Sequence, residues 1–233
     1  MTDHARFDEY AADYDHTVQR AISASGETVQ FFAELKVRLM ARALANRQPN
    51  RILDFGCGIG NTSRALSAGF AQSQITGFDV SEESIAAARA IGGSRDSNIN
   101  YATTHGDRLP FADASFDAVF TSCVFHHIDL EHRSHWAREI RRTLKPEGSF
   151  VFFEHNPFNP LTRQVVRNIP FDDGVILVTP NQARSLLERA NFRTSRPTFY
   201  FFFPAFLRAL RRIEPMLSWI PIGAQYFVVA TAG

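Results

Sequence analysis

The stretch ILDFGCGIGNTS, residues Ile52 to Ser63, decides the fold of this 233-residue chain. An apolar run leads to Asp54, and glycines then occupy every second position, at Gly56, Gly58 and Gly60. Glycines in a strand-to-helix turn let the backbone turn sharply and let a ligand lie against it, because they lack a Cβ atom. The spacing is tighter than the G-x-G-x-x-G of dinucleotide-binding proteins. We therefore expect a ligand other than a pyrophosphate, and the acid before the glycines favours a cationic one.

From residue 51 onward, β-branched and aromatic runs alternate with helical patterns. This alternation is typical of βαβ units that build a parallel sheet. The sequence therefore predicts an α/β fold with a Rossmann-like, doubly wound sheet. We predict strands at 51–56, 74–80, 99–105, 116–123 and 149–155, with two more near 198–203 and 224–232. Predicted helices span 27–47, 61–69, 81–91, 130–144 and 180–192.

Composition excludes several classes of partner and location. Lys and Arg number 25 against 24 Asp and Glu, so no net field draws the chain to nucleic acid. The polar N-terminus lacks the apolar segment of a secretory signal, and the apolar stretch 199–210 is too short to span a membrane. The two cysteines, Cys57 and Cys123, are too few for a disulfide framework. We expect a cytoplasmic protein, not inserted in a membrane, with two small buried thiols.

Two further acids lie at the ends of predicted strands. Asp79 ends the second strand, where a carboxylate can accept both hydroxyls of a ribose. Asp107 follows the third strand and can accept from an adenine amino group, while the backbone N–H of Arg108 is available to a ring nitrogen. Three neighbouring strand ends thus present partners for one adenosine-like ligand.

In this order, the motifs resemble those of class I S-adenosylmethionine (SAM) dependent methyltransferases, in the small-molecule branch related to the ubiquinone and menaquinone methyltransferases. The matching segments lie between residues 7 and 148: FDEYAADYD, ILDFGCGIGNTS, ITGFDVSEESIAAAR, GDRLPFADASFDAVFTSCVFHHI and LKPEGSFVF. The resemblance implies a seven-stranded sheet whose last strand is antiparallel. It also implies SAM as the cofactor and S-adenosylhomocysteine as the product.

The resemblance further implies which residues bind the cofactor. The acid and glycines after the first strand would surround the methionine moiety, the acid after the second strand would take the ribose, and the end of the fourth strand would line the methionine side. The implied cofactor-binding residues are Asp54, Gly56, Cys57, Gly58, Gly60, Asp79, Val80, Asp107, Arg108, Ser122 and Cys123.

Methyl transfer from a sulfonium is an in-line displacement, so the protein mainly holds the acceptor in line and excludes water. A base is needed only for some acceptors, and histidine suits a hydroxyl acceptor. His155 follows the fifth strand and His127 follows the fourth, and both are candidates for the base or for orienting the acceptor. Glu154, Tyr10 and Tyr14 complete the predicted acceptor-binding set with these two histidines.

Four histidines raise the alternative of a metal site. They are His126, His127, His132 and His135. No cysteine or acid at a suitable spacing completes the set. We therefore expect exposed helix histidines and no metal.

We expect one methyltransferase domain over residues 1–233, with a helical cap at 1–50, a SAM-binding core at 51–156 and an acceptor-side lid with the C-terminal strands at 157–233. The 22 phenylalanines favour an apolar or aromatic acceptor pocket, although packing of the sheet accounts for many of them.

The segment between the last two predicted strands carries basic and apolar residues together. Arg208, Arg211 and Arg212, with Met216 and Trp219, form either a solvated helix face or a basic surface that makes peripheral contact with a membrane carrying a lipid-linked substrate.

The sequence predicts a SAM-dependent methyltransferase acting on an oxygen or carbon atom of a small, apolar, aromatic or lipid-linked acceptor, as a monomer or homodimer. One alternative is a SAM-binding accessory module without catalysis. A nucleic-acid or protein methyltransferase is less favoured, because the charge is near neutral and no recognition domain is appended.

Overall fold

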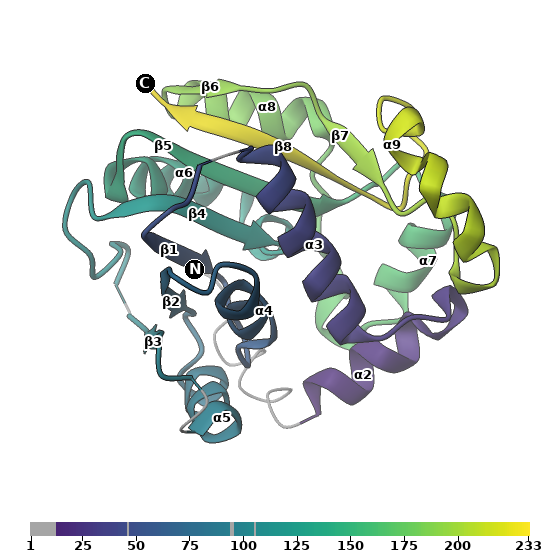
Figure 1. Cartoon of the computed structure of the whole chain (residues 1–233), viewed down its shortest axis with the longest axis horizontal. Helices are drawn as coiled ribbons and strands as arrows, with labels where there is room; N and C mark the ends of the chain where they lie inside the picture. The colour runs from purple at the N-terminus through teal and green to yellow at the C-terminus, as the bar shows by residue number, and fades with distance from the viewer. Residues whose placement is uncertain (1–12, 46, 94–95, 105) are drawn as a thin grey trace.

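The computed structural model describes residues 13–45, 47–93, 96–104 and 106–233. Within these residues eight strands form one central sheet in the order β3-β2-β1-β4-β5-β8-β6, and β7 also pairs with β8 (Figure 1). The first five strands run parallel, and β8 runs antiparallel to β5. The predicted α/β fold with an antiparallel last strand is confirmed. The strands are β1 Arg51–Phe55, β2 Gln74–Phe78, β3 Ile99–Ala102, β4 Phe116–Ser122, β5 Leu144–His155, β6 Phe192–Thr194, β7 Thr198–Tyr200 and β8 Gln225–Ala232.

The outer edge of the sheet differs from the prediction of seven strands. Both β6 and β7 pair antiparallel with β8, one beyond the other along its length. The backbone N–H of Ser195 still donates to the carbonyl of Val229, and the hydroxyl of Ser195 accepts from the N–H of Val229, but the ladder then breaks at Arg196 and Pro197. Proline lacks the N–H that a ladder needs. The seventh position of the sheet, at its edge, is therefore occupied by two short strands, of which the sequence predicted only the second.

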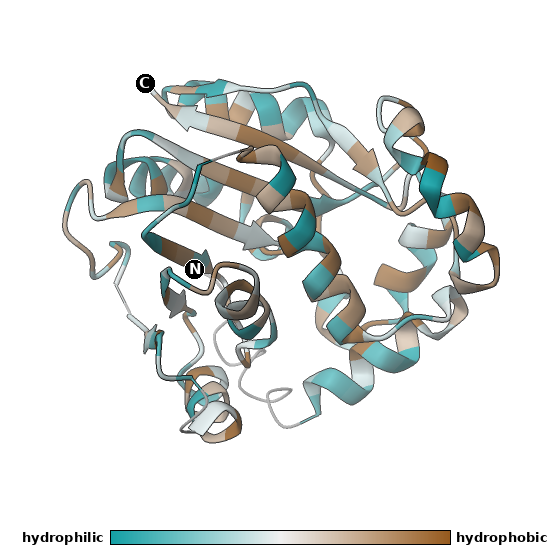
Figure 2. Cartoon of the chain, viewed as in Figure 1, coloured by the Kyte–Doolittle hydropathy of each residue, from teal (hydrophilic) through white to brown (hydrophobic). Residues whose placement is uncertain are grey.

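Helices cover both faces of the sheet, and Figure 2 shows hydrophobic residues along the central strands they cover. One buried cluster joins the sheet to α3 and α4, and the other joins it to α6 and α8. Ile52 belongs to the first cluster and Leu53 to the second, as expected for a parallel strand buried on both faces. The α-helices are α2 Tyr14–Ala21, α3 Val29–Ala43, α4 Asn61–Gly69, α5 Glu82–Gly92, α6 Leu130–Thr143, α7 Pro160–Arg167, α8 Pro180–Arg189 and α9 Glu214–Leu217. The 3-10 helices are η1 Ser23–Ser25, η3 Phe125–His127, η4 Pro170–Asp172 and η5 Ala205–Ile213.

The predicted helices are found, with small differences at their ends. The side chain of Ser81 accepts a hydrogen bond from the backbone of Ser84, so α5 begins one residue later than predicted. β2 and β3 end earlier than predicted, and β5 begins earlier, at Leu144. No helix of the described segments is long and apolar enough to cross a membrane.

The glycine loop joins β1 to α4 and is tied to the end of β2. The backbone N–H groups of Gly56 and Cys57 both donate to the carbonyl of Phe78, at 2.8 and 3.0 Å. Gly56, Gly58 and Gly60 all have positive φ, a region in which residues with a Cβ are strained. A Cβ at Gly56 would lie 2.3 Å from a methyl group of Val124, whereas a Cβ at Gly58 would meet nothing within 4 Å.

This contrast predicts different costs for two alanine substitutions. Gly56→Ala should lower the free energy of unfolding by about 2–4 kcal/mol, because left-handed strain is added to a clash in a packed region. Gly58→Ala should cost only the strain, about 1–2 kcal/mol. Denaturant unfolding of both variants measures the difference, and equal losses would contradict the account of Gly56.

Candidate functional site

A cavity of about 690 Å³ lies at the carboxyl ends of β1, β2, β4 and β5. This volume is within the usual range for small-molecule sites, and the place is where ligands of open α/β sheets bind. The glycine loop lines one part of the cavity, and α2, α3 and α7 line another. The lining includes these predicted site residues: Tyr14, Gly56, Cys57, Gly58, Asp79, Val80, Ser122, Cys123, His127 and His155.

Asp79 fixes the glycine loop against the end of β2. Its Oδ2 atom accepts a hydrogen bond from the backbone of Gly58 at 2.8 Å, and its Oδ1 accepts one from the backbone of Ser81 at 3.0 Å. The position that a Cβ of Gly58 would take is open. The loop is thereby held in a shape that exposes its backbone to a ligand in the cavity.

Two of the predicted residues lie behind the loop and do not belong to the cavity lining. Asp54 is buried and accepts a hydrogen bond from the hydroxyl of Ser63 at 2.6 Å. Burial raises the pKa of Asp54 to about 7, although the Ser63 hydrogen bond lowers it. A Cβ on Gly60 would lie 2.6 Å from the hydroxyl of Tyr101. Both residues are placed to shape the loop.

The predicted adenine-binding residues lie apart from the cavity. Asp107 and Arg108 are exposed and are not among its lining residues. A guanidinium nitrogen of Arg108 lies 3.7 Å from a carboxylate oxygen of Asp113. Their contact with adenine stays a prediction. Tyr10 lies outside the described residues.

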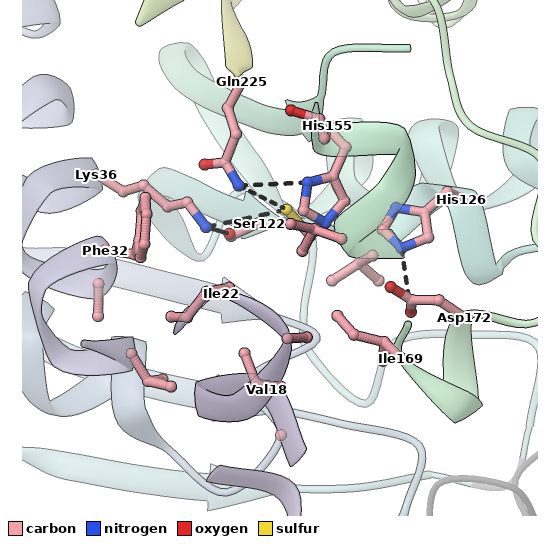
Figure 3. Close-up of a pocket in the computed structure, with 18 of the residues that line it drawn as sticks. Val18, Ile22, Phe32, Lys36, Ser122, His126, His155, Ile169, Asp172 and Gln225 are labelled. Atoms are coloured by element: carbon pink, nitrogen blue, oxygen red, sulfur yellow. Dashed lines mark hydrogen bonds and ion pairs between the residues drawn. The ribbon is translucent and has the colours of Figure 1, made fainter. Parts of the chain in front are cut away.

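A polar cluster at the ends of β4, β5 and β8 faces the apolar part of the cavity (Figure 3). The Nζ atom of Lys36 donates to the hydroxyl of Ser122 at 2.6 Å and lies 3.9 Å from the Sγ atom of Cys123. The amide nitrogen of Gln225 lies 3.3 Å from Nδ1 of His155 and 4.0 Å from the same Sγ. We call these five residues the Lys36 cluster.

The side-chain amide of Gln225 has a fixed orientation. Its oxygen accepts a hydrogen bond from the hydroxyl of Tyr200 at 2.6 Å, so its nitrogen faces His155 and Cys123. The amide N–H can then donate to Nδ1 of His155 when that imidazole is neutral.

The two cysteines have opposite properties. Burial raises the pKa of the Cys123 thiol, but the charges of His155 and Lys36 outweigh it and lower the pKa to about 7. Burial raises the pKa of Cys57 well above its usual value. The expectation of two small buried thiols is therefore wrong for Cys123, which is half-buried in a polar cluster.

A second polar cluster lies beside the first and is almost fully buried. Nδ1 of His126 lies 2.7 Å from a carboxylate oxygen of Glu154. The Oδ1 atom of Asp172 lies 3.8 Å from Nε2 of His126 and 3.2 Å from Nε2 of His127. We call these four residues the His126 cluster. Glu154 lies behind His126 and is not among the residues lining the cavity, although the sequence predicted that it binds the acceptor.

The expectation of exposed helix histidines is wrong for two of the four. His126 and His127 form part of η3, with side chains only 1% and 12% exposed. His132 and His135 do lie on α6 and are not among the residues lining the cavity. Asp172, which lies on η4 far along the chain, joins two of these four histidines, His126 and His127, in a group that could hold a metal ion.

The His126 cluster perturbs the pKa of each imidazole in a different direction. Burial lowers the pKa of His126, but Glu154 and Asp172 outweigh it and hold it well above its usual value. The pKa of His127 is lowered to about 4, first by burial and then by the charge on His126. Burial thus makes His127 a weaker base than a free imidazole, and its predicted role stays a prediction.

Comparison with known proteins finds similar sequences and similar folds among methyltransferases. Residues 52–148, which contain the glycine loop and Asp79, match the family described as a methyltransferase domain. Over these residues the chain is similar to methyltransferase domains. The chain is 33% identical over 117 residues to the demethylmenaquinone methyltransferase of Deinococcus radiodurans. The matched residues make up 50% of this chain and 47% of that protein.

Further relatives extend the match beyond residues 52–148. A malonyl-[acyl-carrier protein] O-methyltransferase of Geobacter sulfurreducens is 27% identical over 215 residues, 84% of this chain and 79% of that protein. The chain spans about half the length of the first curated relatives that it matches. A chain of the complex between the Haloferax volcanii Trm112 methyltransferase activator and a methyltransferase has the same fold, with a TM-score of 0.68 and 22% identity over 97% of each chain.

The cofactor of this domain class, SAM, fits the geometry of the loop. No atom lies within 4 Å of the position that a Cβ of Gly58 would take, so SAM could approach the backbone there. Asp79 has its carboxylate at the cavity wall, where a ribose can reach it.

The position of Asp79 predicts a specific defect. Asp79→Ala should weaken SAM binding by about 100-fold or more, because it removes a ligand contact and the two hydrogen bonds that hold the loop. Calorimetry measures the affinity, and circular dichroism checks that the fold is retained. Glu131→Ala, at an exposed acid on α6, should bind SAM as the unaltered chain does. Equal affinity in Asp79→Ala would refute the ribose assignment.

The lowered pKa of Cys123 predicts pH-dependent alkylation. Iodoacetamide reacts with the thiolate, so its rate at Cys123 should rise with pH around a midpoint near 7, while Cys57 stays unmodified. Lys36→Met should move the midpoint upward, because a cation that favours the thiolate is lost. Lys145→Met, at a lysine paired with Asp117 elsewhere, should leave it unchanged. A midpoint near the ordinary 9.0 in the unaltered chain would contradict this account.

Proposed function

We propose that this chain transfers the methyl group of SAM to an oxygen or carbon atom of a small apolar or lipid-linked acceptor. One observation carries the proposal: a single cavity joins the glycine loop to the Lys36 cluster beneath apolar walls. A donor bound at the loop and an acceptor held at the cluster would share that cavity, as an in-line displacement needs.

The walls of the cavity support an apolar acceptor. Val18 and Ile22 come from the N-terminal helical segment, Phe32 from α3 and Ile169 from the turn after α7 (Figure 3). Tyr14 also lines the cavity, and its ring stacks on that of Phe171 at a centroid distance of 5.2 Å. An acceptor between these side chains would be separated from bulk water, which protects a displacement from hydrolysis.

The Lys36 cluster supports an acceptor with an ionised or ionisable oxygen. Lys36 is only 8% exposed, so its charge acts through little water and would stabilise an oxyanion strongly. Bound SAM supplies the electrophilic methyl group. His155 and Cys123 form a pair that would accept the proton of an acceptor hydroxyl, and a thiol with a pKa of about 7 suits a base near neutral pH.

The mouth of the cavity supports a lipid-linked or amphiphilic acceptor. Leu161 and Phe206 line the cavity and yet are 73% and 80% exposed, and Met216 and Trp219 nearby in the chain are 75% and 74% exposed. Large exposed apolar side chains mark interaction sites. An amphiphilic acceptor would cross this rim with its polar group leading toward the Lys36 cluster.

The basic surface predicted from the sequence is smaller than expected. Arg211 pairs with Glu27 at 2.7 Å, and its guanidinium lies over the rings of Phe31 and Phe201. Arg208 and Arg212 remain exposed beside the apolar rim.

The experiment supplies SAM labelled in its methyl group together with aqueous and organic-phase extracts of cognate cells. We expect label in a product of the organic phase. His155→Gln should lower turnover by about 100-fold, because a base is lost, and should leave SAM affinity unchanged. His132→Gln, outside the cavity, is the matched control. SAM binding with no labelled product in any extract would favour the accessory-module alternative and overturn the enzyme proposal.

A further inference from the structure

The His126 cluster has the composition and layout of a metal site. Its three candidate donor atoms come from His126, His127 and Asp172 and lie within 4.8 Å of one another. A tetrahedral ion with bonds of about 2.0–2.1 Å holds its ligand atoms about 3.3 Å apart. The carboxylate oxygen already lies 3.2 and 3.8 Å from the two Nε2 atoms, so small side-chain movements suffice.

Glu154 provides the support that metal-binding histidines usually have. Its carboxylate lies 2.7 Å from Nδ1 of His126, so that nitrogen can donate its proton and leave the Nε2 lone pair toward Asp172. The same carboxylate accepts the backbone N–H of His126 at 3.3 Å and of His155 at 3.2 Å. Three hydrogen bonds therefore hold the carboxylate of Glu154, and one of them orients the imidazole of His126.

An independent observation concerns Asp172. Its side chain is 3% exposed, and among the described residues its Oδ1 atom receives no hydrogen bond of ordinary geometry. Nε2 of His127 lies 3.2 Å from this oxygen. A buried carboxylate oxygen without a hydrogen bond is costly, and a bound cation would remove that cost.

We propose that His126, His127 and Asp172 bind one divalent transition-metal ion, with Glu154 as a positioning residue for His126. Two imidazoles and one carboxylate suit Zn²⁺ or Fe²⁺ and leave coordination positions open. All three ligands line the cavity, so the open positions face the acceptor space.

The site lies next to the Lys36 cluster. The ring centroids of His126 and His155 are 5.4 Å apart. A metal ion here would bind the acceptor oxygen and lower the pKa of its hydroxyl. This role rests on the proposed function, whereas ion binding itself does not.

The test uses the full chain stripped with a chelator and then titrated with Zn²⁺ by calorimetry, and with Co²⁺ by visible absorption. We expect one ion per chain with micromolar or tighter affinity. Asp172→Asn and His127→Gln should each weaken binding by about 100-fold, and Glu154→Gln by about 10-fold to 100-fold, as loss of an outer-shell partner does. His132→Gln, on α6 and outside the cavity lining, should bind as the unaltered chain does.

Absence of stoichiometric binding by the unaltered chain would overturn the metal proposal and leave an imidazolium held between two carboxylates. The proposal would also be overturned if Asp172→Asn and His127→Gln bound the ion as tightly as the unaltered chain does. The same holds if His132→Gln weakened binding as much as they do. The two ligand variants lie on different elements, so one remains informative if the other does not fold. SAM affinity and methyl transfer measured on the same preparations separate this outcome from failure of the proposed function.

Discussion

The site depends on the hydrogen bonds that the carboxylate of Asp79 accepts from the backbone of Gly58 and Ser81. These bonds join the loop after β1 to the turn after β2, so two neighbouring strand ends act as one wall. Each glycine of the loop has positive φ, and the packing of Val124 against Gly56 leaves no space for a side chain at that position. The cavity, and the acceptor side beyond it, are built against this wall.

The glycine loop that lines the cavity could be predicted from the sequence because its determinants are local. The apolar strand, the acid and the alternating glycines are contiguous, and Asp79 lies one strand further on. The acceptor side could not be predicted in this way. Lys36, Gln225 and Asp172 enter the site from α3, β8 and η4, and ordinary spacing rules do not connect them to Cys123 or to His126. The sequence also failed to predict β6, because a strand of three residues shows too little alternation of apolar and polar positions to be detected.

The end of β5 explains why two polar clusters lie so close together. Successive side chains of a strand point to opposite faces of the sheet. Glu154 therefore reaches the buried side of His126, while its neighbour His155 faces Gln225 in the cavity. One strand end thus contributes to both the His126 cluster and the Lys36 cluster, and a change at either residue is expected to disturb both.

The broken strand pair at the sheet edge has a further consequence. A long, flat edge strand offers a continuous row of unpaired N–H and C=O groups on which another chain can add a strand. Here β6 and β7 each contribute only three residues, with Arg196 and Pro197 between them. The edge cannot template a long intermolecular ladder, and this protects the molecule from aggregation through its own sheet.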